Sequence, residues 1–314
     1  MNFYIICLIG LFLSALLVMI VMPSFIKALK NRNVNQVTSE YALDEFKSKE
    51  KTPIMGGLLF VVMPIIAYII INSIGLGDKK VLFVILSFSL YCMVGLSDDV
   101  LIIVRNKNDG LSPITRLVME FCIALVLFVG FRDVINCQIT IPFTTIGISI
   151  NPIIFIGFMA LLYMAEANAV NFTDGMDGLC AGVSFISLIP FVIISIIRND
   201  FNVAIFLFCV LGGLLAYLYF NHHPAKIFMG DSGSLTLGFL LGIDSLLATT
   251  RTAVIVSMLV PLLAAGVPII DTFFAIIRRK RSHQPIDQAD KGHIHHRLLN
   301  SGLSTKKTVL FMWA

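Results

Sequence analysis

The stretch Asn168–Leu179, N-A-V-N-F-T-D-G-M-D-G-L, places four polar side chains at intervals of three inside an otherwise apolar sequence: Asn168, Asn171, Asp174 and Asp177. Residues three apart are neighbours on a helix surface, so these side chains could line one edge of a helix. Two glycines, Gly175 and Gly178, indicate that the helix ends or breaks here and that backbone comes close to a ligand. Burying carboxylates and amides without partners is costly, so this stretch predicts a functional site.

Other acidic residues stand at the ends of apolar runs. Asp98 and Asp99 follow one such run in G-L-S-D-D-V. Adjacent aspartates repel one another, and they suit a hard divalent cation, or one of them could hold a proton. A solvated helix end is the simpler explanation of this pair.

A second polar loop, Phe220–Ser234, reads F-N-H-H-P-A-K-I-F-M-G-D-S-G-S and contains Asn221 and Asp231. Its Gly-Asp-Ser-Gly-Ser segment precedes an apolar run, which predicts a helix N-terminus rich in backbone N–H donors. Such an N-terminus suits an anion or a metal–phosphate group. Simple capping of the helix by Asp231 or Ser232 competes with this interpretation.

Two basic segments could also meet a phosphate. Lys51 stands in K-T-P-I-M-G-G, where Pro53 is expected to start a helix. Near the end of the sequence, K-G-H-I-H-H-R-L-L gathers His293, His295, His296 and Arg297. The histidine spacing is not that of a standard zinc site and no cysteine is nearby, so binding of a phosphate or sugar is favoured over zinc.

The elements that must position these residues are membrane helices. The sequence is 57% hydrophobic and 13% charged, far more apolar than a soluble domain. We predict an all-α polytopic membrane protein in a single domain, 1–314, with about ten transmembrane helices, nine complete and the start of a tenth. The predicted spans are Phe3–Met22, Ile54–Ile74, Val81–Ser97, Leu117–Phe131, Ile153–Ala167, Leu179–Ile197, Val203–Phe220, Leu235–Thr249, Ala253–Ile277 and a last span from Thr308, which we expect to be truncated at Ala314.

Basic residues predict the orientation. Eighteen of the 23 lysines and arginines, Arg116 among them, fall in alternate loops and the other five in the loops between, so the first set is cytoplasmic and the N-terminus is outside. The net charge of +4 follows from this topology and does not argue for nucleic acid. Cytoplasmic loops are expected at about 23–53, 98–116, 168–178, 221–234 and 278–307, and the outer segment Arg132–Pro152 is expected to form a short hairpin.

All the polar motifs therefore fall on one membrane face. Carboxylates hold Mg²⁺ or Mn²⁺, and the cation with lysine, arginine and helix N-termini stabilises phosphate charge. A site at the membrane edge suits one water-soluble and one lipid substrate, so the residues predict Mg²⁺-dependent phosphoryl transfer onto a lipid. Three further acids lie within or near the spans, where interior packing or interhelix hydrogen bonding is as well supported as function, and they are left outside the site: Glu120, Glu166 and Asp244.

These motifs, in order from about Lys51 to Leu299, resemble the polyprenyl-phosphate N-acetylhexosamine-1-phosphate transferase family. The resemblance implies a bacterial cytoplasmic-membrane enzyme whose active site faces the cytoplasm. It implies transfer of a sugar-1-phosphate from a UDP-sugar to undecaprenyl phosphate with release of UMP, which starts a lipid-linked cell-envelope glycan. Membrane lipid surrounds such an enzyme, and a homodimer would fit.

The resemblance also implies roles for individual residues. Asp98 resembles the proposed base that deprotonates the lipid phosphate, with Asp99 beside it, and Asp231 matches the main Mg²⁺ ligand, with Asp99 as a second candidate. A covalent aspartate nucleophile remains an alternative. Residues implied to bind the substrates are Lys51, Asn168, Asn171, Asp174, Asp177, Asn221, His293, His295, His296 and Arg297.

Two donor sugars compete. K-T-P-I-M-G-G and F-N-H-H-P-A-K resemble the phospho-N-acetylmuramoyl-pentapeptide transferases, which make lipid I for peptidoglycan. The last loop, with its His293-Ile294-His295-His296 order, resembles the N-acetylglucosamine-1-phosphate transferases. Because that loop is thought to face the sugar, UDP-GlcNAc is favoured.

Two unrelated functions are alternatives. A secondary transporter also has many helices and intramembrane acids, but it gathers them near the midplane, whereas here they crowd one face. A CDP-alcohol phosphotransferase would need several spaced aspartates in one short motif, and Asp174 to Gly178 matches only part of it.

Overall fold

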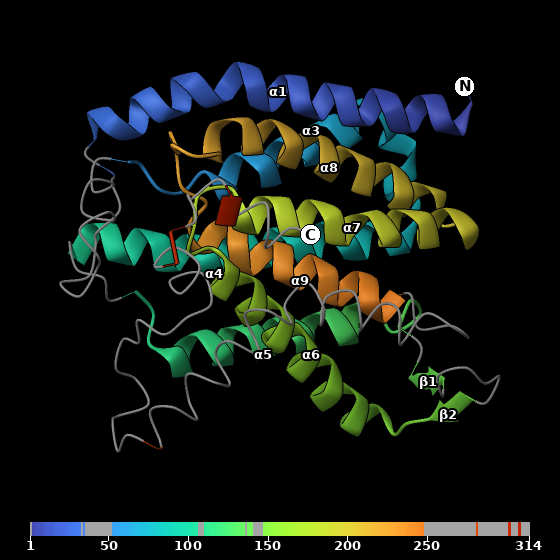
Figure 1. Cartoon of the computed structure of the whole chain (residues 1–314). Coiled ribbons are helices and arrows are strands. Elements are labelled where there is room, and N and C mark those ends of the chain that lie inside the picture. Colours follow the sequence, from blue (N-terminus) through green and yellow to red (C-terminus); the bar gives the residue numbers. More distant parts are fainter. Residues whose placement is uncertain are drawn as a thin grey trace.

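The structure, a computed structural model, describes residues 2–32, 34, 52–105, 110–135, 137–140, 147–247, 281, 301–302 and 307–308. Within them the chain is helical apart from one small hairpin (Figure 1). The elements are α1 Phe3–Asn31, α3 Gly57–Asn72, the 3₁₀ helix η1 Ser73–Gly77, α4 Lys79–Arg105, α5 Pro113–Gly130, β1 Gln138–Thr140, β2 Gly147–Ser149, α6 Pro152–Thr173, α7 Leu179–Ile197, α8 Phe201–Asn221 and α9 Asp231–Leu247.

Several helix starts follow from local sequence. The Asn2 side chain accepts a hydrogen bond from the backbone N–H of Tyr4 and caps α1. Ser112 and Asn151 cap α5 and α6 in the same way, each followed by a proline in the first turn. These residues satisfy backbone donors that a helix N-terminus leaves unpaired, and proline fits there because its missing N–H is not needed.

Six described helices are long and apolar enough to cross a membrane: α1, α4, α5, α6, α7 and α8. The chain is therefore a multi-pass membrane protein, which confirms the predicted class. The α7 helix has the predicted bounds, Leu179–Ile197. The predicted ninth span, Ala253–Ile277, and all but the first residue of the tenth lie outside the described residues.

The helices α1, α4 and α6 continue well past the ends of the predicted spans, whereas α6 ends just before Gly175 and Gly178, where the sequence predicted a helix end. The α4 helix includes Asp98 and Asp99 and runs on to Arg105, and α6 includes Asn168 and Asn171. Asp99 can lie inside a helix because its carboxylate accepts hydrogen bonds from the N-terminus of α9. The site residues therefore stand on rigid helices, where their positions are better fixed than in loops.

The helices pack as a bundle around α8 and α9 (Figure 1). The α8 helix lies against α1, α3 and α7, whereas α9 lies against α4 and α6, and α5 packs on α4 and α6. The N-terminal end of α1 and the hairpin lie at the same end of the bundle in Figure 1. That both lie on the outer side of the membrane stays a prediction.

The predicted hairpin is present, with β1 and β2 antiparallel and Ile139 opposite Ile148. The expectation that Pro53 starts a helix is wrong, because α3 begins at Gly57. The Pro53 carbonyl instead accepts a hydrogen bond from the N–H of Phe228, and the N–H of Gly56 donates to the Phe228 carbonyl. This backbone pairing fixes the segment before α3 against the loop before α9.

Small residues let α1 and α8 approach closely. A Cβ on Gly212 would stand 2.0 Å from the Leu11 carbonyl oxygen, and a Cβ on Gly10 would stand 2.8 Å from the sulfur of Cys209. Apolar burial does not drive helices together in lipid, so such close packing is a main source of their association.

We predict that Gly212→Ala lowers the stability of the detergent-solubilised protein by about 1–3 kcal/mol, because the helix backbones must separate to admit a methyl group. Thermal unfolding followed by circular dichroism measures this. Gly157→Ala in α6 is the matched control, since its Cβ would meet nothing within 4 Å among the described residues. An unchanged midpoint for Gly212→Ala would contradict the packing described.

Candidate functional site

Polar groups from four parts of the chain meet at one end of the bundle. They come from α4, from the start of α5, from the end of α6 with the turn that follows it, and from the N-terminus of α9. The structure thus brings together the predicted site residues Asp98, Asp99, Asn168, Asn171, Asp174 and Asp231.

Asp99 holds the N-terminus of α9. Its carboxylate accepts hydrogen bonds from the backbone N–H of Asp231 at 2.9 Å and from that of Ser232 at 3.1 Å, and the residue is only 2% exposed. A helix N-terminus carries unpaired N–H donors and a partial positive charge, both of which a carboxylate satisfies. Asp99 on α4 is thus the cap of another helix, and it fixes where Asp231 stands.

Glycines make this contact possible. A Cβ on Gly95, one turn before Asp99, would lie 2.1 Å from the Asp231 carbonyl oxygen. Gly230 has a φ of 74°, and a Cβ there would lie 2.6 Å from an oxygen of Asp99. No other residue type fits either position without moving the carboxylate or the helix.

Asp98 points to the connection between α4 and α5. Its Oδ1 accepts a hydrogen bond from the backbone N–H of Leu111 at 2.8 Å, and a Cβ on Gly110 would lie 2.2 Å from Oδ2. The neighbouring aspartates therefore have different surroundings. Asp99 is committed to a helix cap, whereas Asp98 lies against a connecting segment.

Asp231 is the centre of a side-chain network. Its Oδ1 accepts a hydrogen bond from the Asn171 amide at 2.9 Å, and its Oδ2 lies 3.3 Å from a guanidinium nitrogen of Arg116. A second Arg116 nitrogen donates to the side-chain oxygen of Asn168 at 2.9 Å. The Arg116 and Asp231 side chains are about one quarter exposed, so this network borders solvent.

Sequence reasoning missed Arg116 as a site residue, because its charge was counted only toward topology. A signal was present: Arg116 is the fourth residue of α5, and a cation is disfavoured in the first turn of a helix. Such a placement indicates a carboxylate or phosphate partner nearby.

Asp177 and Asn221 form a separate group of hydrogen bonds, between the turn after α6 and the loop before α9. Asp177 Oδ2 accepts a hydrogen bond from the N–H of Ala225 and lies 2.9 Å from Nδ1 of His223. Asn221 accepts a hydrogen bond from the N–H of Gly178 and donates to the Ile227 carbonyl. Asp177 therefore does not share one helix edge with Asn168 and Asn171, because α6 ends at Thr173 and the turn redirects it.

Burial and crowding raise the pKa values of the site carboxylates. Burial, together with the carboxylates of Asp231 and Asp99, raises the pKa of Asp174 well above its usual value. Burial and the Asp98 carboxylate also raise the pKa of Asp231, although Asn171 and Arg116 oppose the shift. Closely spaced acids of this kind are stabilised in their ionised form by a bound cation.

The donor set fits Mg²⁺ or Mn²⁺. Among the described residues no three His, Cys, Asp or Glu side chains enclose a metal site as they stand. Mg²⁺ does not require such a cage, because it binds through one or two carboxylates, waters and substrate phosphates. Asp231, with Asp98 and Asp174 within electrostatic reach, meets that requirement.

Five predicted substrate-binding residues lie outside the described residues: Lys51, His293, His295, His296 and Arg297.

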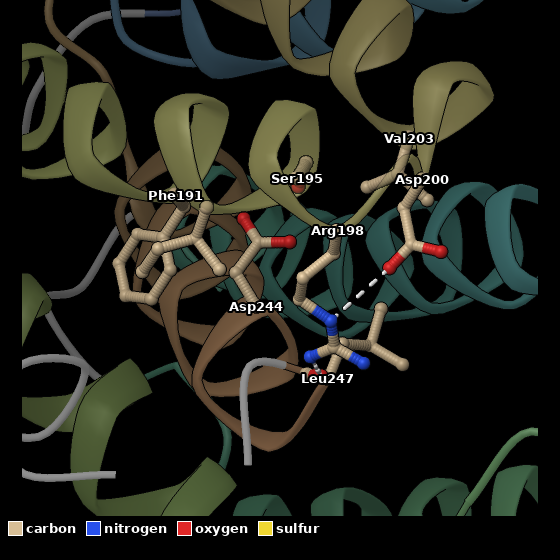
Figure 2. A pocket seen from close by; sticks show the side chains of 8 residues that line it. Phe191, Ser195, Arg198, Asp200, Val203, Asp244 and Leu247 are labelled. Carbon is tan, nitrogen blue, oxygen red and sulfur yellow. Dashed lines mark hydrogen bonds and ion pairs between the residues drawn. The ribbon is translucent and has the colours of Figure 1, made fainter. Parts of the chain in front are cut away.

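A small pocket lies at the other end of α7 and α9 (Figure 2). Asp244 and Arg198 project into it, and Arg198 forms an ion pair with Asp200 and donates a hydrogen bond to the Leu247 carbonyl. Asp244 is 13 residues from Asp231, roughly 20 Å along a helix. This pocket is therefore separate from the Asp231 network.

An apolar helix bundle with carboxylates, amides and a guanidinium gathered at one end defines a multi-pass membrane protein with a polar candidate site. Residues 81–249, more than half of the chain, match glycosyl transferase family 4, so the chain belongs to this family and is a transferase.

Individual relatives are similar over almost the whole chain. A phospho-N-acetylmuramoyl-pentapeptide-transferase of Halalkalibacterium halodurans is 31% identical over 311 residues, 98% of this chain and 93% of the relative. The Bacillus subtilis protein named "Probable undecaprenyl-phosphate N-acetylglucosaminyl 1-phosphate transferase" is also 31% identical, over 96% of this chain and 80% of the relative. A phospho-N-acetylmuramoyl-pentapeptide-transferase of Clostridium beijerinckii is 34% identical over 82% of this chain and 76% of the relative.

We predict that Asp99→Asn lowers the free energy of unfolding by about 1–3 kcal/mol, because the amide offers one oxygen where two backbone N–H groups need acceptors. Thermal unfolding with a metal chelator present measures the capping role apart from any bound cation. Asp133→Asn is the matched control, since Asp133 forms only an exposed ion pair with Lys79, and such pairs contribute little. A loss of stability seen only without the chelator would contradict capping as the main role of Asp99.

Proposed function

We propose that the protein transfers a sugar-1-phosphate from a UDP-N-acetylhexosamine to undecaprenyl phosphate in the presence of Mg²⁺, with release of UMP. The observation that carries the proposal is the Asp231 network at the end of the bundle, where carboxylates, two amides and Arg116 converge. The names of the relatives support these substrate classes. One name states transfer of a phospho-N-acetylmuramoyl-pentapeptide, and the other states an undecaprenyl-phosphate N-acetylglucosaminyl 1-phosphate transferase.

In the proposed reaction an oxygen of the lipid phosphate attacks the sugar-bearing β-phosphorus of the UDP-sugar. The bond from that phosphorus to the bridging oxygen breaks, and the bridging oxygen leaves with UMP. A proton on the lipid phosphate must be removed for this attack. We assign this proton transfer to Asp98. It is within electrostatic reach of Asp231, the proposed metal ligand, and accepts its own hydrogen bond from the N–H of Leu111.

Phosphoryl transfer depends mainly on positioning and on stabilising negative charge. Arg116 can donate to a phosphate oxygen from the partly exposed side of the network, and Asn168 and Asn171 fix the orientation of Arg116 and Asp231. Mg²⁺ or Mn²⁺, when bound to Asp231, supplies charge neutralisation for the diphosphate. Asp99 is proposed to support this site mainly through α9, whose N-terminus it fixes.

The cytoplasmic side of the membrane is proposed for the site, from the distribution of basic residues. Lys51 is proposed to lie near the phosphates, because the segment that follows it pairs with the loop before α9. The cluster His293, His295, His296 and Arg297 is proposed to meet the sugar. On the His-Ile-His-His order we favour UDP-GlcNAc, with UDP-MurNAc-pentapeptide as the alternative donor.

We expect purified protein to release UMP when it is given UDP-GlcNAc, undecaprenyl phosphate and Mg²⁺. The same assay with UDP-MurNAc-pentapeptide compares the two donors at equal concentration. A higher kcat/KM for the pentapeptide substrate would reverse our choice of donor and leave the reaction class intact. No UMP with either donor, from protein that is folded and monodisperse, would contradict the proposed function.

We expect Asp231→Asn to reduce kcat by at least about 100-fold, because a neutral amide cannot replace a carboxylate as metal ligand. UMP release at saturating Mg²⁺ measures this. Asp244→Asn is the control, because it makes the same change on the same helix, roughly 20 Å from Asp231. Activity of Asp231→Asn near that of the control, with both proteins folded, would refute the assignment of Asp231.

A further inference from the structure

Glu120 is a buried acid that the proposed reaction does not use. It lies on α5 with 0% exposure, and neither carboxylate oxygen has a hydrogen-bond partner in the described part of the chain. An unpaired buried carboxylate is costly, especially inside a membrane bundle. Glu120 therefore calls for a partner that it meets in another state of the protein.

Arg116, one turn earlier on the same helix, is a basic group that acts electrostatically on Glu120. Residues four apart on a helix have side chains close enough to pair. Arg116 in turn has a buried Nε without an acceptor among the described residues, although its two terminal nitrogens are bound to Asp231 and Asn168. Glu120 is within electrostatic reach of both Arg116 and Asp231.

Cation binding at Asp231 requires a change in this network. Both Asp231 oxygens are already engaged, Oδ1 by Asn171 and Oδ2 by Arg116. A cation and a guanidinium repel each other and compete for the same oxygens. We therefore expect Arg116 to loosen its contact with Asp231 when a cation binds there, and a counter-charge within reach of its helix position then stabilises it.

We propose that Glu120 is a positioning residue that pairs with Arg116 when Asp231 binds the divalent cation. Arg116 is then shared between two carboxylates, Asp231 without the cation and Glu120 with it. Glu120 itself contacts neither substrate nor metal. This inference rests on the proposed function, since it assumes that Asp231 binds the cation.

The test measures binding of Mn²⁺ to the full-length protein in detergent by electron paramagnetic resonance, without substrates. For Glu120→Gln we expect the Kd for Mn²⁺ to rise by roughly 3- to 10-fold, within the range of coupling between neighbouring charged groups. Asp244→Asn is the matched control, because Asp244 is also a buried acid with a carboxylate oxygen that has no partner among the described residues. It should leave the Kd unchanged. In the transfer assay Glu120→Gln should need more Mg²⁺ for half-maximal rate while kcat at saturating Mg²⁺ stays within about twofold.

A double-mutant cycle separates an effect through Arg116 from a direct effect of charge on the cation. In an Arg116→Gln background, Glu120→Gln should change the Kd for Mn²⁺ by less than about twofold. An equal change in both backgrounds would overturn the role of Arg116, and an unchanged Kd in the single variant would overturn the proposal. Glu120→Asp, which keeps the charge but shortens the side chain, should shift the Kd in the same direction and serves if Glu120→Gln does not fold.

The two levels of inference can fail separately. If the unsubstituted protein binds Mn²⁺ and releases UMP while Glu120→Gln behaves like Asp244→Asn, only the role of Glu120 is wrong. If the unsubstituted protein neither binds Mn²⁺ nor releases UMP, the proposed function is wrong.

Discussion

The contact between the Asp99 carboxylate and the N-terminus of α9 is the interaction on which the rest of the site depends. It joins the C-terminal part of one long helix to the first residues of another, and it satisfies two backbone donors that lipid or a dry interior would leave unpaired. Because the second of these helices begins with Asp231, the contact also sets the position and direction of the central carboxylate. The surrounding glycines, Gly95 and Gly230, are needed because the carboxylate and the helix end meet without room for a side chain.

Around that contact the site has two sets of hydrogen bonds, which differ in whether a ligand could replace them. Asn221 and Asp177 hold the turn after α6 against the loop before α9, through hydrogen bonds largely to backbone atoms. Asn171 and Arg116 use side-chain groups to hold Asp231, and side-chain contacts of this kind can be replaced by a ligand. The side-chain contacts at Asp231 can therefore change, because hydrogen bonds to the backbone keep the surrounding segments in place.

Much of the fold could be predicted because the length of an apolar run is a strong local signal, and Leu179–Ile197 has the predicted bounds. The predicted span ended α4 too early, since polarity alone cannot tell an exposed aspartate from one that caps a distant helix. Asp99 is the second kind, and its partner is more than 130 residues away. The acids and amides of the site could be found from their types and spacing, but Arg116 could not be separated from the basic residues that set topology. Asn221 joins Gly178 to Ile227 by hydrogen bonds, and no local sequence pattern predicts these contacts.

The electrostatics explain why a site of this composition is suited to a cation and a diphosphate together. Asp231, Asp98, Asp99 and Asp174 lie close enough to raise the pKa of Asp174 and of Asp231, so without added positive charge their ionised forms destabilise one another. Arg116 offsets part of that charge in the structure, but it does so at Oδ2 of Asp231, an oxygen that a bound cation would also use. In the proposed function, binding of a divalent cation relieves the repulsion and releases the terminal guanidinium nitrogens from Asp231, so that they can donate to a phosphate oxygen while Arg116 pairs with Glu120. On that proposal, the crowding of carboxylates, which would be unfavourable in a merely structural helix end, would supply binding free energy to the substrate complex.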